Sequence, residues 1–140
     1  MVTFAVGHPI VPGEARGSVL LSENSLSLWG GIEPKTGQII DHRHDRYGEF
    51  LVDRIFALPA EKGSSTGSAV LLELIRVGKA PAAIITRHLA PILALGSIIA
   101  RELYDVELPI LLLSESEYGA LSDGETVQID YDGTVSFPDK

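Results

Sequence analysis

The spacing of hydrophobic positions predicts two helices in the second half of the chain. In "SAVLLELIRVGK", Val70, Leu71, Leu74 and Ile75 form an apolar stripe on a helix that Gly78 ends. The segment "APILALGSIIARELYD" is the second amphipathic helix, and its proline suits a first turn. A short helix or turn is expected over "ESEYGALS".

Other segments have the pattern of strands. The clearest are the continuous apolar runs "PAAIIT" and "ELPILLLS", a composition typical of strands buried on both faces. Strands are also expected at about residues 14–21, in "GQIID", in "DRIFALPA" up to Pro59, and in "ETVQIDYDGTVSF". The last segment reads as a hairpin with a two-residue turn at Asp132-Gly133.

These elements predict a single α/β domain over residues 1–140. Strands and helices alternate in the second half, which favours a small, mainly parallel sheet with right-handed crossovers. The first and last parts are rich in strands and lack helices, so we expect them to form a second sheet layer. The predicted architecture is therefore three layers, β/β/α.

Composition narrows the function. The 140 residues are 45% hydrophobic, with a formal net charge of −8 and no cysteine. The acidic balance argues against nucleic acid and anionic membranes as partners. No apolar run reaches the ~20 residues that span a bilayer, and no secretory signal is visible, so a cytoplasmic location is expected. Without thiolates, the chain itself cannot hold an iron–sulfur cluster by cysteine.

The motif "GSSTGS", residues 63–68, follows a predicted strand and opens a helix. In open α/β sheets ligands bind at this edge, and a helix N-terminus favours an anion. Its serines could instead be helix caps, but one residue is enough for a cap. Four hydroxyls and two glycines in six residues therefore favour a function. The motif lacks the GK[ST] ending of a P-loop.

Two further motifs leave alternatives open. In "DHRHD", His42 and His44 would share a face of a strand and could bind a metal with Asp41 or Asp45, but a solvated polar loop is the favoured interpretation. His88, at a strand end, could face the same cleft as His44, or lie on the surface. In "SLWGG", the pair Gly30-Gly31 either lets the backbone approach a ligand or makes a bend.

Three segments together resemble the small subunit of the aconitase X family. They are "LWGGIEPKTGQIIDHRHDRYGE", "KGSSTGSAVLLELIRVGKAPAAIITR" and "PILALGSIIARELY", and the likeness extends over roughly residues 11–113. The resemblance implies the swivelling β/β/α domain of the aconitase type. It also implies a subunit of a dehydratase, a hydro-lyase that is inactive without its cysteine-containing large subunit. The iron–sulfur cluster would lie on that large subunit, with no metal bound by this chain.

The resemblance also assigns site residues. Aconitase-type enzymes have Gly-Ser-Ser-Arg at this helix entry, where the first serine takes the substrate proton and the arginine holds a carboxylate. The matching residues are Gly63-Ser64-Ser65-Thr66, so Ser64 falls on the position of the base and Thr66 replaces the arginine. The predicted substrate-binding residues are Gly63, Ser65, Thr66, Ser68, Gly30 and Gly31.

The expected substrate is a small anionic hydroxy acid, and tricarboxylates are in doubt without the arginine. Family members act on cis-3-hydroxy-L-proline, which is the preferred prediction, or on mevalonate 5-phosphate. The alternative class is a non-catalytic swivel module that binds an anion or carries a phosphohistidine on His44 or His88. Ser64 would be essential in the dehydratase, and a histidine would be essential in the carrier.

Overall fold

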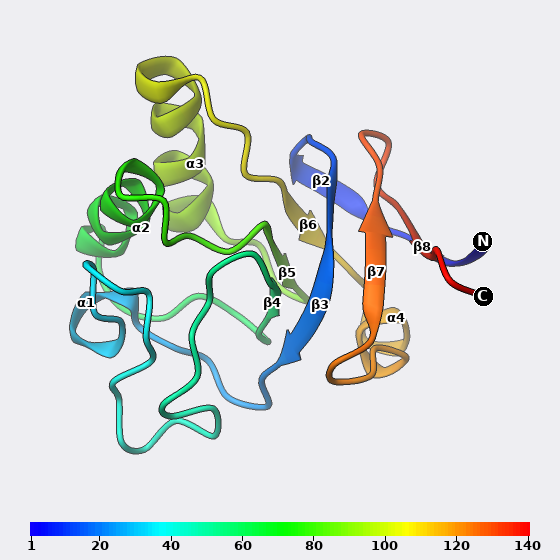
Figure 1. The fold of residues 1–140 in the computed structure, drawn as a ribbon, viewed down its shortest axis with the longest axis horizontal. Coiled ribbons are helices and arrows are strands. Elements are labelled where there is room, and N and C mark those ends of the chain that lie inside the picture. Colours follow the sequence, from blue (N-terminus) through cyan, green and yellow to red (C-terminus); the bar gives the residue numbers. More distant parts are fainter.

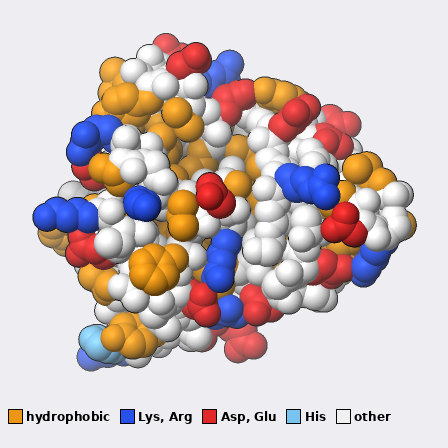
Figure 2. All heavy atoms as spheres, in the orientation of Figure 1, with side chains coloured by type: hydrophobic (Ala, Val, Ile, Leu, Met, Phe, Trp, Pro, Cys, Tyr) orange, Lys and Arg blue, Asp and Glu red, His pale blue; other side chains and the backbone are white.

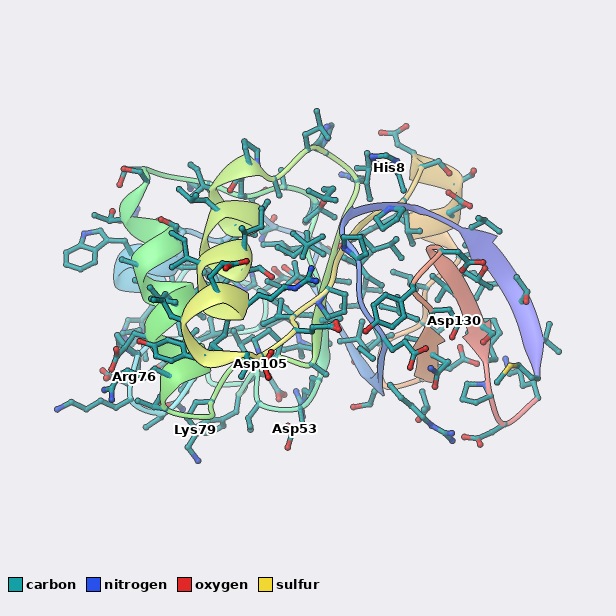
Figure 3. All side chains as sticks on the ribbon, turned by 90° about the horizontal axis from the view of Figure 1, so that it is seen from above. His8, Asp53, Arg76, Lys79, Asp105 and Asp130 are labelled. Atoms are coloured by element: carbon teal, nitrogen blue, oxygen red, sulfur yellow. The ribbon has the colours of Figure 1, made fainter.

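The computed structural model describes all 140 residues, and it has three layers (Figure 1). The strands are β1 (Val2–Val6), β2 (His8–Val11), β3 (Ala15–Leu21), β4 (Ile55–Ala57), β5 (Ala83–Thr86), β6 (Ile110–Leu112), β7 (Thr126–Ile129) and β8 (Thr134–Phe137). The helices are α1 (Leu28–Gly31), α2 (Thr66–Arg76), α3 (Pro91–Tyr104) and α4 (Glu115–Gly119). Seen from above, α2 and α3 form one outer layer and the β7–β8 hairpin lies on the opposite side (Figure 3).

The sheet has a parallel half and an antiparallel half that share β3. The strand order is β1-β8-β7-β3-β4-β5-β6-β2. Strands β3 to β6 are parallel, while β1, β8, β7 and the start of β3 pair antiparallel. Because β1 and β2 stand at opposite ends of this order but are separated only by Gly7, the sheet closes on itself. A Cβ at Gly7 would lie 2.8 Å from Leu111 and Leu113 side-chain atoms, so the closure requires a residue without one.

Each face of the parallel strands covers its own hydrophobic core. Phe56 and Ile84 belong to the cluster beneath α2 and α3, whereas their strand neighbours Ile55 and Ile85 belong to the cluster against the antiparallel half. Successive side chains of a strand point to opposite faces. This explains why β4 and β5 are buried at every position and why their sequences are continuously apolar.

The predicted helices and fold class are confirmed. Helix α2 buries the stripe predicted from its spacing, and Gly78 follows its end with a φ of +74°. Helix α3 begins at Pro91, as predicted, and the short helix α4 is also present. Ser114 caps α4 in a capping box with Glu117.

Two local predictions were wrong. The segment "GQIID" forms only isolated bridges, between Ile32 and Ile39 and between Gln38 and Phe50. The β7–β8 hairpin has a three-residue loop: Asp130 and Thr134 face each other, and Gly133 has a φ of +90°. The segment "DHRHD" forms turns, in agreement with the favoured interpretation as a polar loop, so His42 and His44 share no strand face.

Candidate functional site

The loops after β3 and β4 meet the 41–46 turns at the carboxyl edge of the parallel strands. Two pockets open there. The polar pocket, of about 440 Å³, is lined only by polar residues: Asn24, Ser25, Asp41, Arg43, His44 and Lys62. The second pocket, of about 230 Å³, is mixed and is lined by Leu21, Ser22, Glu23, Pro59, Arg87, Tyr118, Gly119 and Leu121. The carboxyl edge is where ligands bind in open α/β sheets.

The hydroxyl-rich loop lies next to the polar pocket in the chain, because Lys62 precedes Gly63-Ser64. None of its side chains caps α2: the N-cap residue Ser65 makes no side-chain cap bond. The Ser64 hydroxyl is 2.5 Å from that of Thr66, and the Ser68 hydroxyl donates to the Ser65 carbonyl at 2.6 Å. The helix mouth is therefore open to a ligand, and the interpretation of the serines as caps is not supported.

The neighbours of Gly63 fix the path of the chain into this loop. Gly63 has a φ of +99°, and a Cβ there would lie 2.6 Å from the Ser27 hydroxyl. The preceding Glu61 pairs with Leu26 as a bridge. Its carboxylate accepts hydrogen bonds from the backbone N–H groups of Ile92 and Leu93 at the start of α3. The start of the segment is thus held by two distant parts of the chain.

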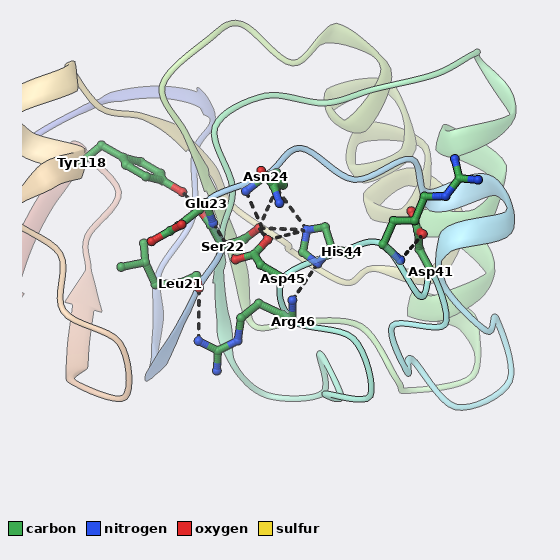
Figure 4. A network of polar contacts seen from close by, with 10 residues as sticks. Leu21, Ser22, Glu23, Asn24, Asp41, His44, Asp45, Arg46 and Tyr118 are labelled. Atoms are coloured by element: carbon green, nitrogen blue, oxygen red, sulfur yellow. Dashed lines mark hydrogen bonds and ion pairs between the residues drawn. The ribbon is translucent and has the colours of Figure 1, made fainter.

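A buried polar network supports the other wall of the polar pocket (Figure 4). His44 is only 6% exposed, which the sequence interpretation of an exposed loop missed. Its Nε2 lies 2.9 Å from the Ser22 hydroxyl and 3.0 Å from the Asn24 carbonyl. Its Nδ1 accepts from the Arg46 backbone N–H. Since that N–H can only donate, the neutral ring carries its proton on Nε2.

Asp45 and Tyr118 extend this network. Burial acts to raise the pKa of Asp45, but hydrogen bonds from the Glu23 and Asn24 backbone N–H groups outweigh it and the pKa lies below its usual value. Burial raises the pKa of Tyr118 well above its usual range, and the positive charge of Arg87 only partly offsets this. Tyr118 therefore stays protonated and donates to the Ser22 carbonyl at 2.9 Å.

Three basic side chains without an ion-pair partner line these pockets. Lys and Arg are dispersed among acidic residues over the face in Figure 2. Five of the eleven basic residues form ion pairs. Of the remaining six, Arg43 and Lys62 line the polar pocket, and Arg87 lines the second one. Arg87 places its guanidinium 5.5 Å from the centre of the Tyr118 ring, and its Nε is buried without a partner.

The remaining residues predicted for the site lie outside both pockets. Gly30 and Gly31 belong to α1, which packs on α2, but they line neither pocket. His88 is exposed, and its carbonyl accepts from the Thr86 hydroxyl. His42 is exposed, with its ring centre 4.5 Å from that of Tyr47. Their predicted roles stay predictions.

Sequence reasoning missed Asn24, Arg43, Lys62 and Arg87 as pocket residues. The available signal was the polar run "SENS" directly after a predicted strand, at the edge where ligands bind. The basic residues gave no signal of their own, because their lack of acidic partners is visible only in three dimensions.

The residues of this chain do not fit an iron–sulfur cluster or another metal centre. The chain has no cysteine. Nowhere do three or more His, Asp or Glu side chains come together as a metal-binding group. No helix is both long and apolar enough to cross a membrane.

The fold and the pockets together define a class of protein. It is a three-layer β/β/α domain with polar pockets at the carboxyl ends of its parallel strands. The chain belongs to the aconitase X swivel domain family, whose model matches residues 5–137. This confirms the family resemblance in the sequence.

Two similar proteins are named cis-3-hydroxy-L-proline dehydratase. One, from Hypocrea jecorina, is 42% identical over 93% of this chain, and one from Pseudomonas aeruginosa is 47% identical over 79%. The chain spans only about a fifth of their length, 22% and 19%. The phosphomevalonate dehydratase small subunit of Methanosarcina acetivorans is 36% identical, with 88% of this chain and 82% of the subunit covered.

A solved structure supports the fold. The crystal structure of Thermococcus kodakaraensis aconitase X in its holo-form superposes with a TM-score of 0.83 at 34% identity, covering 94% of this chain and 95% of that one.

Proposed function

We propose that this chain is the swivel-domain part of an aconitase-type dehydratase, a hydro-lyase that removes water from a small hydroxy acid. The observation that carries the proposal is the uncapped mouth of α2, where the Ser64 side chain is exposed and Lys62, two residues earlier in the chain, lines the polar pocket. The names of the relatives suggest cis-3-hydroxy-L-proline as the substrate, which we prefer, or mevalonate 5-phosphate as the alternative.

In the proposed reaction Ser64 is the base. It takes the proton from the carbon next to the substrate carboxylate, a carbon–carbon double bond forms, and hydroxide leaves from the neighbouring carbon. Serine is a weak base in water, so its alkoxide needs stabilisation. The adjacent Thr66 hydroxyl can donate to Ser64 Oγ. The partial positive charge of the α2 N-terminus favours the same negative charge.

The neighbouring residues are proposed to hold the substrate. The exposed Ser65 hydroxyl and the α2 backbone N–H groups are suited to orient a carboxylate. Ser68 already donates to the Ser65 carbonyl, so its role is to fix the shape of the loop. Gly63, by its positive φ, determines where Ser64 stands.

A cysteine-bearing large subunit is the proposed partner. The family resemblance implies an iron–sulfur cluster, and since the residues of this chain do not fit one, we propose that the partner holds it. The carrier alternative is disfavoured at His44, because that ring is buried and both nitrogens already have hydrogen-bond partners.

The test uses the chain assembled with its large subunit. We expect dehydration of cis-3-hydroxy-L-proline, measured by the appearance of the unsaturated product, and a loss of about 100-fold or more in kcat for Ser64→Ala. An assembled enzyme that dehydrates neither candidate substrate would refute the proposal. Full activity of Ser64→Ala would refute only the assignment of the base.

A further inference from the structure

Trp29 is exposed, although the turn that carries it is fixed. It is the only tryptophan of the chain and is 67% exposed. Its neighbours in α1, Leu28 and Gly31, are buried. The Ser27 hydroxyl donates to the Trp29 carbonyl at 3.2 Å, and Gly30 gives the turn a φ of +77°, which glycine adopts without steric cost. The backbone is thus held in place while a large aromatic side chain stays in solvent.

A pocket of about 210 Å³ lies next to this side chain, where α1 packs on α2 (Figure 1). Its lining is apolar apart from a threonine and a glutamate, and consists of Trp29, Pro34, Thr66, Ala69, Val70 and Glu73. The Glu73 carboxylate accepts from the Arg76 guanidinium at 2.9 Å, so the one charge in the lining is already neutralised. The pocket is therefore suited to an apolar side chain more than to an ion.

This pocket borders the loop of the proposed base. Thr66, the first residue of α2, belongs to the pocket lining, and its hydroxyl lies 2.5 Å from that of Ser64. On the opposite flank of the loop, Leu89 is 68% exposed. After the terminal methionine, Leu89 and Trp29 are the most exposed large hydrophobic residues of the chain.

The order of the strands explains why the loop has these two flanks. The segment before the loop continues β4, which lies between β3 and β5. Glu61 forms a bridge with Leu26 on the β3 side, which leads into α1. The Pro59 carbonyl accepts from the Arg87 backbone N–H at 3.1 Å on the β5 side, which leads into α3. A partner that reaches Ser64 therefore passes between two exposed apolar side chains.

We infer that the large subunit docks over the Ser64 loop with Trp29 as the anchor of the interface, and that it fills the pocket beside Trp29 with an apolar side chain. The inference rests on the proposed dehydratase function, because that chemistry needs a metal centre that the residues of this chain do not fit. The site is incomplete until a partner covers the mouth of α2. A buried aromatic side chain removes ~150–250 Å² from solvent, a sizeable part of the ~800 Å² that each partner of a typical complex buries.

Two observations favour the large subunit over a second copy of this chain as the occupant. A symmetric dimer brings the same residues to both sides of its interface. It would cover one Ser64 loop with another and supply no metal centre. The name of the Methanosarcina acetivorans relative, a dehydratase small subunit, implies a larger partner for that protein.

The first measurement titrates the chain with the purified large subunit by calorimetry. Trp29→Ala should weaken assembly about tenfold or more, the loss typical of an interface anchor. The matched control is Leu103→Ala, which removes a residue that is 62% exposed in the last turn of α3, at the end of that helix away from the Ser64 loop. It should assemble like the wild type. Thermal denaturation of both variants establishes that the fold is retained, and an excess of large subunit should restore the turnover of Trp29→Ala.

The second measurement needs no variant. Because the chain has one tryptophan, incorporation of a fluorinated tryptophan gives a single fluorine NMR signal from this residue. Addition of the unlabelled large subunit should shift this signal. It should also reduce the difference in chemical shift between ordinary and deuterated water, since the ring leaves the solvent.

Three results would each overturn the inference: assembly of Trp29→Ala at the wild-type affinity, an equal loss in Leu103→Ala, or a fluorine signal that keeps its position and solvent exposure in the assembled enzyme. A dimer of the isolated chain that Trp29→Ala separates would also overturn it, because the occupant would then be a second copy.

Dehydration, assayed on the same preparations, tests the proposed function separately. A complex anchored at Trp29 that dehydrates neither candidate substrate would support the docking surface and refute the proposed function. An active enzyme in which Trp29→Ala assembles normally would do the reverse.

Discussion

Gly63 determines the course of the chain into the Ser64 loop. We predict that Gly63→Ala destabilises the fold by about 1–2 kcal/mol, because an alanine is strained at positive φ. It should also lower kcat strongly, since the added Cβ would lie 2.6 Å from the Ser27 hydroxyl and displace the loop. Chemical denaturation and steady-state kinetics of the assembled enzyme measure the two effects.

A second glycine serves as the control. Gly124 also has a positive φ, +80°, but open space where a Cβ would be. Gly124→Ala should lose similar stability and keep its kcat. If both variants keep their kcat, the loop position does not depend on Gly63.

Asp45 makes the stability of the pocket wall dependent on pH. Its pKa is lower in the folded chain than in the unfolded one, where it is about 3.9. The stabilisation is therefore complete above about pH 4 and is lost as pH falls through the folded pKa.

We predict that Asp45→Asn lowers Tm by about 2–5 °C at pH 7, the effect of weakening about one net hydrogen bond. The deficit should shrink below pH 4, where the wild type loses the same stabilisation. Melting curves at several pH values test this, with the exposed Glu14→Gln as control. A deficit that stays constant down to pH 2 would show that the charge of Asp45 is not the cause.

At the scale of single residues, the sequence predicted the position of some site residues and missed the burial of others, for a physical reason. Ser64 was placed correctly at a helix mouth because hydroxyls, glycines and the following apolar stripe are all local signals. The burial of His44 was missed because its partners, Ser22 and Asn24, are about 20 residues away in the chain. A polar run carries no pattern that identifies such distant partners.

At the scale of elements, Glu61 joins the Ser64 loop to α3. The N-cap position of α3 is Ala90, which cannot cap, and the Glu61 carboxylate accepts the N–H groups of Ile92 and Leu93 in its place. We predict that Glu61→Ala costs about 1–2 kcal/mol of folding stability, the usual value of a helix cap. Amide hydrogen exchange should also rise in both residues 61–66 and the first turn of α3.

Glu102→Gln, on the exposed side of α3, should change stability by less than about 0.5 kcal/mol. If exchange in Glu61→Ala rises only in α3, the carboxylate caps the helix without positioning the loop.

The elements differ in how well the sequence specified them. Helices α2 and α3 followed from a 3.6-residue period, and the strands β5 and β6 from unbroken apolar runs. The closure of the sheet could not be predicted, since it depends on β1 pairing with β8 and β2 pairing with β6 across most of the chain. The β/β/α layers themselves did follow, because they depend only on the order of elements.

At the scale of the whole molecule, the chain has a complete core but no metal-binding group. We predict that the isolated chain unfolds in one cooperative transition and binds no iron. It should show no dehydration alone and should form a complex when mixed with the large subunit at micromolar concentration, as measured by light scattering. Iron–sulfur absorbance in the purified chain, or turnover without a partner, would contradict the proposal that the large subunit holds the cluster.

The central claim is that the Ser64 hydroxyl takes the substrate proton, and hydrogen exchange at the substrate carbon tests it most directly. The assembled enzyme is incubated with cis-3-hydroxy-L-proline in deuterated water, and deuterium in the recovered substrate is followed by NMR and mass spectrometry. We predict that the wild type exchanges the hydrogen on the carbon next to the carboxylate, and that Ser64→Ala exchanges it at least about 100-fold more slowly. Exchange at the wild-type rate in Ser64→Ala would contradict the account and place the base on another residue.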